Sequence, residues 1–245
     1  MSTLRPFFTY YGGKWATAPR YPAPAYDRIV EPFAGSAGYS VRHHAREVVL
    51  WDLNERVIGT WQYLIRASAE EILSLPLLEP GQSVDDLSVC QEARWLVGWL
   101  ISKGASFPRK TMSAWGREPR YVSQFWGEQI RARVASQVGF IKHWSAELVD
   151  YRDGGIVEAT WFIDPPYQEM GRHYPCSTID YAHLGEWCRS LPGQVIVCEG
   201  SDATWLPFEH FADVKSTSGR QKPSRVSREL IYVQDTCGNV TRQHH

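Results

Sequence analysis

Apolar and polar positions divide the chain into three blocks. In the first block, to about residue 62, residues 27–33 and 47–52 form short apolar runs, and residues 38–45 and the segment after Asp52 follow them with helical spacing. Short buried runs that alternate with helices are typical of a parallel α/β sheet. We therefore expect a strand–turn–helix–strand–helix opening.

The second block, residues 63–152, lacks convincing strand alternation. Apolar residues recur at helical spacing over 68–80, 85–103 and 125–149, whereas 104–124 is rich in Gly, Pro, Ser and Arg and is expected to be a loop. The third block, residues 153–245, returns to α/β. It contains expected strands at 157–163 and 194–198, a helix at 179–190, and a final antiparallel pair at 211–216 and 229–235.

Composition narrows the class of protein. The 245 residues are 43% hydrophobic and 22% charged, with a net charge of −1, which is ordinary for a globular protein. The five cysteines form no CxxC pair and have no metal-ligand spacing with histidine, so neither a disulfide framework nor a zinc site is expected. No signal peptide or long apolar span is present, so we expect a soluble intracellular protein that does not enter a membrane.

The segment Glu31–Gly38 joins the first expected strand to a helix. Gly35 and Gly38 allow close approach of a ligand, and a helix N-terminus accepts polar or anionic groups. Asp52, at the end of the next strand, is suited to accept hydrogen bonds from the two hydroxyls of a ribose. This pattern alone leaves open a generic strand–helix turn and a nucleoside site.

The segment Asp164-Pro165-Pro166-Tyr167 follows a strongly apolar strand. The prolines remove two backbone donors, which leaves the Asp164 carboxylate and the Pro165 carbonyl as acceptors. Two acceptors suit an exocyclic –NH2 group, whose lone pair is conjugated with the ring. Holding that group promotes attack on an electrophilic methyl by positioning and electrostatics. Tyr167 offers a ring on which an extruded base can stack.

These motifs resemble those of the Dam-like (D12 class, alpha-group) DNA adenine-N6 methyltransferases. The matching pieces are Tyr11-Gly12-Gly13-Lys14, Glu31–Gly38, the strand ending at Asp52, and Asp164–Tyr167, in the family's order. The resemblance implies a Rossmann-like S-adenosylmethionine-dependent methyltransferase fold, α/β, with a mostly parallel sheet and an antiparallel C-terminal hairpin. Residues 1–62 and 153–245 would form the catalytic domain, and residues 63–152 a helical target-recognition insert.

The resemblance also implies roles for individual residues. A methyl group would pass from S-adenosylmethionine to N6 of a flipped-out adenine, with S-adenosylhomocysteine as the product and no metal. Catalytic roles fall to Asp164, Pro165, Pro166 and Tyr167. The cofactor would be bound by Tyr10, Tyr11, Gly12, Gly13, Lys14, Glu31, Pro32, Phe33, Ala34, Gly35, Ser36, Gly38, Asp52, Leu53 and Asp164.

Charge is distributed unevenly. Residues 94–152 contain ten Lys or Arg, four Asp or Glu and ten aromatics, although the whole chain is slightly acidic. Arginines can grip phosphates or read guanine edges, and aromatics can stack on bases. A second basic stretch, 215–228, has five basic residues and no acid. We expect contacts to double-stranded DNA from Lys14, Arg109, Lys110, Arg117, Arg120, Tyr121, Arg220, Lys222 and Arg225. In each case an ordinary solvated surface is the alternative.

Two other functions stay open at this point. Cytosine N4, an RNA amine or a protein amide also presents a conjugated nitrogen, and a non-catalytic nucleic-acid-binding module could use the same fold. The resemblance favours adenine in DNA and a monomer or weak dimer in the cytoplasm, encoded by a bacterium or phage. The recognition sequence and the existence of a restriction nuclease partner are left open. No functional role is assigned to the terminal pair His244-His245.

Overall fold

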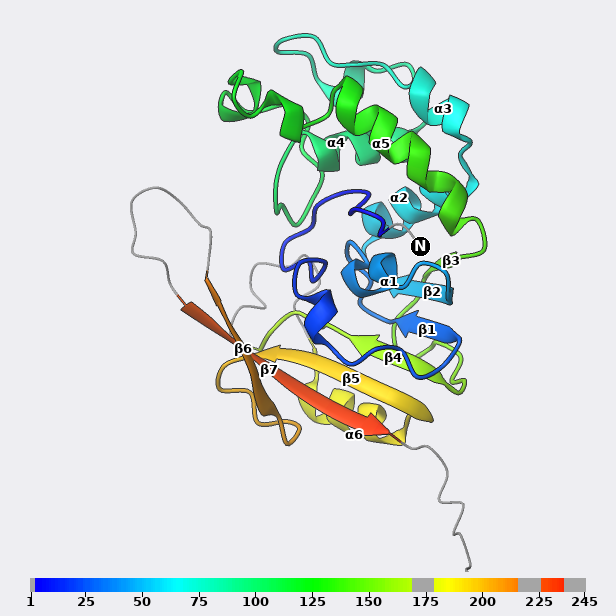
Figure 1. The fold of residues 1–245 in the computed structure, drawn as a ribbon, viewed down its shortest axis with the longest axis vertical. Coiled ribbons are helices and arrows are strands. Elements are labelled where there is room, and N and C mark those ends of the chain that lie inside the picture. The colour runs from blue at the N-terminus through cyan, green and yellow to red at the C-terminus, as the bar shows by residue number, and fades with distance from the viewer. Residues whose placement is uncertain (1–2, 169–178, 216–225, 236–245) are drawn as a thin grey trace, which may run out of the picture.

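The computed structural model describes residues 3–168, 179–215 and 226–235, and a central sheet organises this part of the chain (Figure 1). Its seven strands follow the order β3-β2-β1-β4-β5-β7-β6. They are β1 (Arg28–Glu31), β2 (Glu47–Asp52), β3 (Ser145–Leu148), β4 (Ala159–Ile163), β5 (Gly193–Gly200), β6 (Glu209–Lys215) and β7 (Val226–Asp235). β1 to β5 run parallel, and β7 is antiparallel to both β5 and β6. The predicted α/β fold with an antiparallel C-terminal hairpin is confirmed.

The central strands are buried on both faces, which explains their continuous apolar sequences. Successive side chains point to opposite faces, so Phe162 packs in one core while Trp161 and Ile163 pack in the other. Helix α6 (Tyr181–Ser190) contributes Leu184 and Trp187 to the second core. Each face of the sheet therefore has its own core.

Two helices follow the first two strands. α1 (Gly38–Arg42) is a short helix after β1, and α2 (Glu55–Arg66) follows β2. The Asn54 side chain caps α2 by accepting a hydrogen bond from the Arg56 amide, while the Asp180 side chain caps α6. These elements agree with the predicted opening and with the predicted helix at 179–190.

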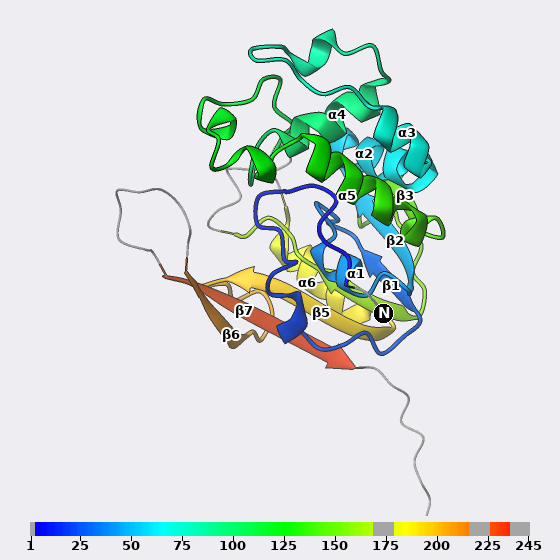
Figure 2. The same cartoon turned by 45° about the horizontal axis from the view of Figure 1, so that its top comes forward.

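Helices α3 (Ala69–Ser74), α4 (Gln91–Leu100) and α5 (Glu128–Val138) lie beyond one end of the sheet (Figure 2). The predicted helices at 68–80 and 85–103 are longer than the observed ones. A single-turn 3-10 helix occupies Val84–Asp86. Two others, Trp115–Arg117 and Val122–Gln124, lie within the predicted loop at 104–124, which therefore contains local turns. Two more lie at Ala18–Arg20 and Gly139–Ile141. Among the helices described, none is long and apolar enough to cross a membrane.

The predicted helix over 125–149 is wrong at its C-terminal end. Residues 145–148 form β3, which pairs in parallel with β2 from Val49↔Ser145 to Asp52↔Leu148. Only Ala146 of this edge strand is buried, so its sequence carries no strand alternation. The expected insert, 63–152, thus ends with a strand that belongs to the main sheet.

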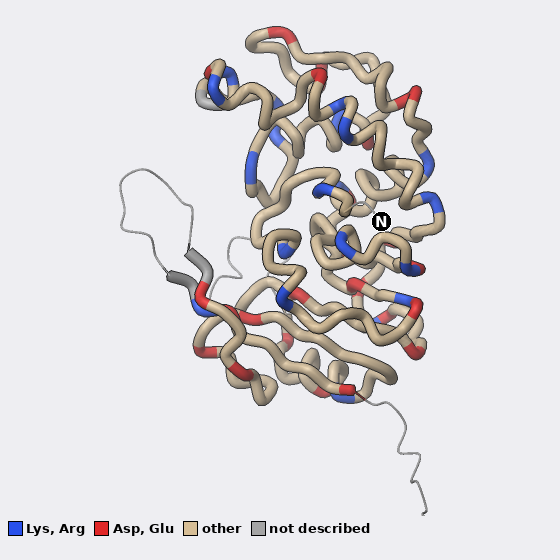
Figure 3. Tube along the Cα trace, viewed as in Figure 1, with Lys and Arg blue, Asp and Glu red and all other residues tan. Residues whose placement is uncertain are grey.

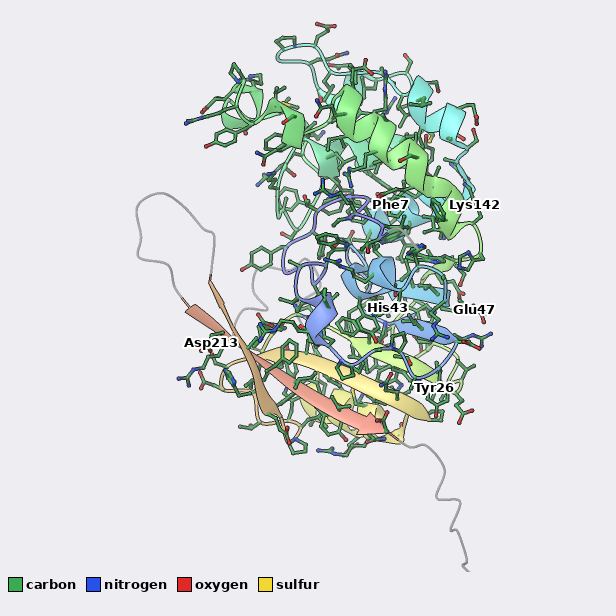
Figure 4. All side chains as sticks on the ribbon, in the orientation of Figure 1. Phe7, Tyr26, His43, Glu47, Lys142 and Asp213 are labelled. Atoms are coloured by element: carbon green, nitrogen blue, oxygen red, sulfur yellow. The ribbon has the colours of Figure 1, made fainter. Side chains whose placement is uncertain are left out.

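The N-terminal segment packs against α2 and forms hydrogen bonds with the helical region. Phe7 lies where the helical region and the sheet meet (Figure 4) and packs edge-on against the buried Trp61, with ring centroids 5.7 Å apart. Nearby, the Tyr11 amide donates a hydrogen bond to the Ala105 carbonyl at 3.2 Å, and the Thr9 hydroxyl donates one to the Ser102 carbonyl. The N-terminal segment is therefore attached to both parts of the molecule.

Candidate active site

One cavity lies at the carboxyl ends of the parallel strands, where open α/β sheets bind ligands. Its walls come from the end of β1, the end of β2, the segment after β3 and the segment after β4. Every residue predicted to contact the cofactor lines this cavity, including Tyr10, Glu31, Gly35, Asp52 and Asp164. The structure thus brings together motifs that are up to 150 residues apart in sequence.

Glycines allow the turn after β1 to pack against the N-terminal segment. A Cβ added at Gly38 would lie 2.3 Å from the Trp15 backbone nitrogen, and one added at Gly13 would lie 2.8 Å from Ser36 Oγ. Gly35 has φ +46°, and its missing Cβ would contact the Tyr10 ring at 3.0 Å. The two glycine motifs recognised separately in the sequence therefore form one wall of the cavity.

Two carboxyl groups flank that turn. Asp52 Oδ2 accepts a hydrogen bond from the Gly35 amide at 3.0 Å, and Oδ1 accepts one from Asn54 at 2.8 Å. Burial raises the pKa of Asp52 to about 6, against the effect of these amide donors. Glu31 is almost fully buried, accepts a hydrogen bond from the Ser40 amide at 2.8 Å, and has its pKa raised by burial to about 8. At neutral pH, Asp52 is mainly ionised and Glu31 is mainly neutral.

Lys14 and Asp164 form a buried ion pair. Lys14 Nζ donates hydrogen bonds to Asp164 Oδ2 at 2.9 Å and to the Gly12 carbonyl at 3.0 Å. The same nitrogen lies 2.8 Å from Asp164 Oδ1, but this buried oxygen accepts no hydrogen bond from the part of the chain that the structure describes. The ammonium also lies 4.9 Å from the centroid of the Tyr167 ring. The cation therefore joins the N-terminal motif to the segment after β4.

Opposing effects set the charge of this pair. Burial is the largest effect and lowers the pKa of Lys14, but the interactions with Asp164, Cys198 and Glu229 together outweigh it, and the pKa is raised. Burial raises the pKa of Asp164 to about 6, although Lys14 favours its ionised form. The side chains are only 8% and 19% exposed, so water screens their attraction weakly. At neutral pH the cavity contains an ammonium and a mainly ionised carboxylate.

The four predicted catalytic residues occupy different positions around the cavity. Asp164 and Pro166 line it, while Pro165 is buried and Tyr167 is half-buried beside it. The Pro166 carbonyl accepts a hydrogen bond from the Tyr181 hydroxyl at 2.6 Å. Helix α6 therefore helps to fix the backbone that carries Asp164.

Sequence reasoning missed part of the cavity wall. Val149, Asp150, Tyr151 and Arg152 line it, and they follow the unpredicted strand β3. Arg152 donates two charge-assisted hydrogen bonds to Asp150 and lowers the pKa of that carboxyl. Further lining residues absent from the prediction are Ala37, Asn54, Phe162, Ile179 and Asp180. Locating β3 in the sequence would have assigned 149–152 to this edge.

The residues predicted to contact DNA lie in two regions. Arg109, Lys110, Arg117 and Arg120 are exposed on the helical region, where Figure 3 shows Lys and Arg on the loops between α4 and α5. Some of these cations have partners within the chain: Lys110 pairs with Asp85 at 2.5 Å, and Arg120 with Glu118 at 2.8 Å. The half-buried Tyr121 follows Arg120, whose guanidinium lies 4.8 Å from its ring centroid.

Arg109 and Lys110 line a second, larger cleft. Its volume is about 1070 Å³, against about 220 Å³ for the cavity at the sheet edge, and Lys103, Phe107 and Trp95 also line it. The Arg109 guanidinium lies 4.7 Å from the Phe107 ring centroid. Lys14, predicted to contact both the cofactor and DNA, is buried and lines the smaller cavity. Arg220, Lys222 and Arg225 lie outside the described residues.

Residues 10–86 match the model of the D12 class N6 adenine-specific DNA methyltransferases. No protein of curated function matches the chain. The matched segment contains Lys14, the turn after β1 and Asp52, and the ion pair connects it to Asp164 outside the match. The family decides between the substrates left open by the sequence in favour of adenine in DNA, and it implies the use of S-adenosylmethionine. Over these 77 residues of the 245, the sequence is that of a D12 class N6 adenine-specific DNA methyltransferase.

Proposed function

We propose that Asp164 and the Pro165 carbonyl hold the N6 amino group of a flipped-out adenine while the Tyr167 ring stacks on the base. The observation that carries this assignment is the buried Asp164 Oδ1, which has no hydrogen-bond donor among the described residues. The Lys14 ammonium 2.8 Å away compensates the charge of this oxygen without a hydrogen bond, so its lone pairs can accept one from an amino group of the substrate. Asp164 also lies at the carboxyl end of β4, beside β1, whose carboxyl end lines the same cavity.

S-adenosylmethionine bound in this cavity would supply an activated methyl group on its sulfonium, and the neutral thioether would be the leaving group. The amino nitrogen of adenine forms the new N–C bond and then loses one proton. Asp164, with a pKa raised by burial to about 6, is suited to accept hydrogen bonds from the amine and to receive that proton or pass it to water. The sulfonium already activates the methyl group, so we propose that no metal takes part.

The residues of the cavity suit the cofactor. Asp52 retains lone pairs after accepting two amide hydrogen bonds, so it can also accept from the ribose hydroxyls. Phe33 and Tyr151 lie with ring centroids 5.6 Å apart and both line the cavity, which suits a flat heterocycle. Asp150 can accept a hydrogen bond from an amino group of that heterocycle. The turn formed by Ala34, Gly35 and Ser36, with Glu31 behind it, would surround the remaining part of the cofactor.

Lys14 has a proposed role inside the cavity. Its buried ammonium holds Asp164, so we assign it to orientation of that carboxylate and to contact with the flipped nucleotide. Because the ammonium occupies one side of Asp164, the incoming amine has to share the carboxylate with it. Contact with phosphates on the outer surface of the duplex is left to the exposed cations.

The helical region, 63–152, is the proposed target-recognition insert, with β3 as its junction to the catalytic sheet. Arg109, Lys110, Arg117, Arg120 and Tyr121 would contact double-stranded DNA there, and Arg220, Lys222 and Arg225 would contact the backbone. Both views place the end of β6, the start of β7 and the loops after α4 on the same side of the molecule (Figures 1 and 2), which supports a shared DNA surface. We propose a monomer, or at most a weak dimer, that acts on DNA in the cytoplasm.

The function is tested by transfer of a labelled methyl group to duplex DNA, followed by digestion to nucleosides and identification of the modified base. Wild-type protein should produce N6-methyladenine, and EDTA should not reduce the yield. Asp164→Ala should abolish transfer while it still binds S-adenosylmethionine in a calorimeter. Retained transfer by Asp164→Ala, or label in a base other than adenine, would contradict the proposal.

A further inference from the structure

Tyr167 is held by more than its place in the chain. A Cβ added at Gly200, the last residue of β5, would lie 2.9 Å from Tyr167 Cδ2, so the ring packs directly on a position that has no side chain. Its hydroxyl donates a hydrogen bond to Glu229 Oε2 on β7. Gly200 and Glu229 are cross-strand partners in the β5–β7 register. One pair of neighbouring positions thus supports both the ring and its hydroxyl.

Two properties strengthen the hydrogen bond between the Tyr167 hydroxyl and Glu229. Burial, together with the charges of Asp164 and Glu229, raises the pKa of Tyr167 well above its usual value, so the hydroxyl keeps its proton and remains a donor. A carboxylate acceptor forms shorter and stronger hydrogen bonds than a neutral oxygen does. Glu229 is half-buried, which limits competition from water. Rotation about the Cα–Cβ bond of Tyr167 would displace the hydroxyl and break this hydrogen bond.

The backbone around Tyr167 is fixed independently. The Pro166 carbonyl on one side accepts from Tyr181, and the Gln168 amide on the other donates to Glu199 Oε1 at 3.3 Å. Glu199 is 1% exposed and also accepts hydrogen bonds from the Gly200 amide at 2.8 Å and from Trp205 Nε1 at 3.0 Å. The side-chain torsions of Tyr167 are then the remaining freedom, and Glu229 restricts them.

We propose that Glu229 is a positioning residue for methyl transfer. It acts through the Tyr167 hydroxyl to fix the position of the ring on which the flipped adenine stacks, and the close packing of the ring on Gly200 limits its plane. The inference rests on the proposed role of Tyr167. A base that stacks on a misplaced ring presents its amino group at the wrong distance or angle, and an error of about 1 Å can cost roughly 10²-fold in rate.

The test compares wild type with Glu229→Ala, Glu229→Gln, Tyr167→Phe and the double variant Glu229→Ala/Tyr167→Phe. The substrate is a duplex that contains a site methylated by the wild-type protein. Glu209→Ala is the matched control, because Glu209 is an exposed glutamate on the adjacent strand β6. Single-turnover transfer gives the chemical step, calorimetry gives the affinity for S-adenosylmethionine, and 2-aminopurine at the target position reports stacking of the flipped base.

Glu229→Ala should slow single-turnover transfer by about tenfold or more, with the affinity for S-adenosylmethionine changed less than twofold and with brighter 2-aminopurine in the complex. Glu229→Gln should recover most of the rate, because the amide oxygen still accepts the hydroxyl proton. The double variant should be no slower than the slower single variant, because both changes remove the same hydrogen bond. Gly200→Ala, which pushes the ring from the other side, should slow transfer as well.

Several results would overturn the positioning role. They are a wild-type rate for Glu229→Ala, equal losses for Glu229→Gln and Glu229→Ala, or multiplied losses in the double variant. Loss of rate in Glu209→Ala equal to that of Glu229→Ala would also overturn it. If Glu229→Ala does not fold, Glu229→Gln and Gly200→Ala still decide the matter. Failure of the proposed function is recognised separately, because Asp164→Ala would then transfer methyl groups as well as wild type does.

Discussion

Gly38 is the position at which one added methyl group should damage both stability and catalysis. It begins α1 and lines the cavity, and its φ is not in the left-handed region, so an alanine there suffers no backbone strain. The new Cβ, however, would lie 2.3 Å from the Trp15 nitrogen and 2.8 Å from the Lys14 carbonyl carbon. Ordinary van der Waals contact begins near 3.4 Å, so the Lys14–Trp15 backbone must move by about 1 Å.

The magnitude follows from that displacement. Overpacking of this kind typically costs about 1–3 kcal/mol, and backbone atoms yield less easily than the end of a side chain. For a chain of this length, a loss of 1 kcal/mol lowers the melting temperature by about 2–4 °C, so the expected decrease is roughly 2–12 °C. The Lys14 ammonium would move with its backbone relative to Asp164, and a displacement of about 1 Å should slow transfer by up to about 10²-fold.

Thermal unfolding and single-turnover methyl transfer measure the two effects for Gly38→Ala. Gly139→Ala is the matched control, because nothing lies within 4 Å of its added Cβ and its φ of −61° suits alanine. The control should keep the wild-type rate and should gain up to about 1 kcal/mol in stability from a less flexible unfolded chain. If Gly38→Ala melts and reacts like the control, the close packing of the turn against the N-terminal segment is refuted.

Three further predictions concern charge. Burial raises the pKa of Asp164 to about 6, and protonation of this carboxylate removes a hydrogen-bond acceptor. The single-turnover rate should therefore rise with pH up to about 6 and then level off, and a flat pH–rate profile would contradict this. For Glu31 the folded-state pKa of about 8 lies above the ordinary value of 4.5, so the folded protein keeps this proton to higher pH than the unfolded chain does. The free energy of unfolding should therefore fall as the pH rises between these two values, by up to about 1.4 kcal/mol per pH unit. In denaturation experiments, Glu31→Gln should show a weaker dependence of the free energy of unfolding on pH. Arg109→Ala should weaken duplex binding and reduce the slope of the logarithm of the binding constant against the logarithm of salt concentration by about one. Lys110→Ala should have a smaller effect, because Lys110 already pairs with Asp85. An unchanged salt slope for Arg109→Ala would exclude its phosphate contact.

The sheet was predictable because its central strands are buried on both faces. Phe162 and its neighbours on β4 are fully buried, so the apolar run is continuous and visible in the sequence. β3 lies at the edge of the sheet and buries one side chain, so its four residues resemble the end of the preceding helix. The same omission explains the missed cavity residues, because 149–152 follow β3 as Asp164 follows β4.

Local motifs predicted the cavity, and cross-strand contacts could not be predicted. Glu31–Gly38 and Asp164–Tyr167 are contiguous, so glycine, proline and carboxylate chemistry can be read from the sequence directly. Glu229 reaches Tyr167 only because β7 turns back beside β5 and places it opposite Gly200. No spacing in the sequence fixes that register, because residues 201–225 separate β5 from β7.

The strand order explains how the active site is independent of much of the insert. β4 pairs with β1 although the helical region separates them in sequence, so the sheet alone places Asp164 beside Glu31. The insert nevertheless contacts the N-terminal segment through hydrogen bonds from Thr9 and Tyr11 to carbonyls at 102 and 105. These bonds lie three to five residues from Lys14. An insert replaced to change the target sequence would therefore have to preserve them, or Lys14 would lose its position against Asp164.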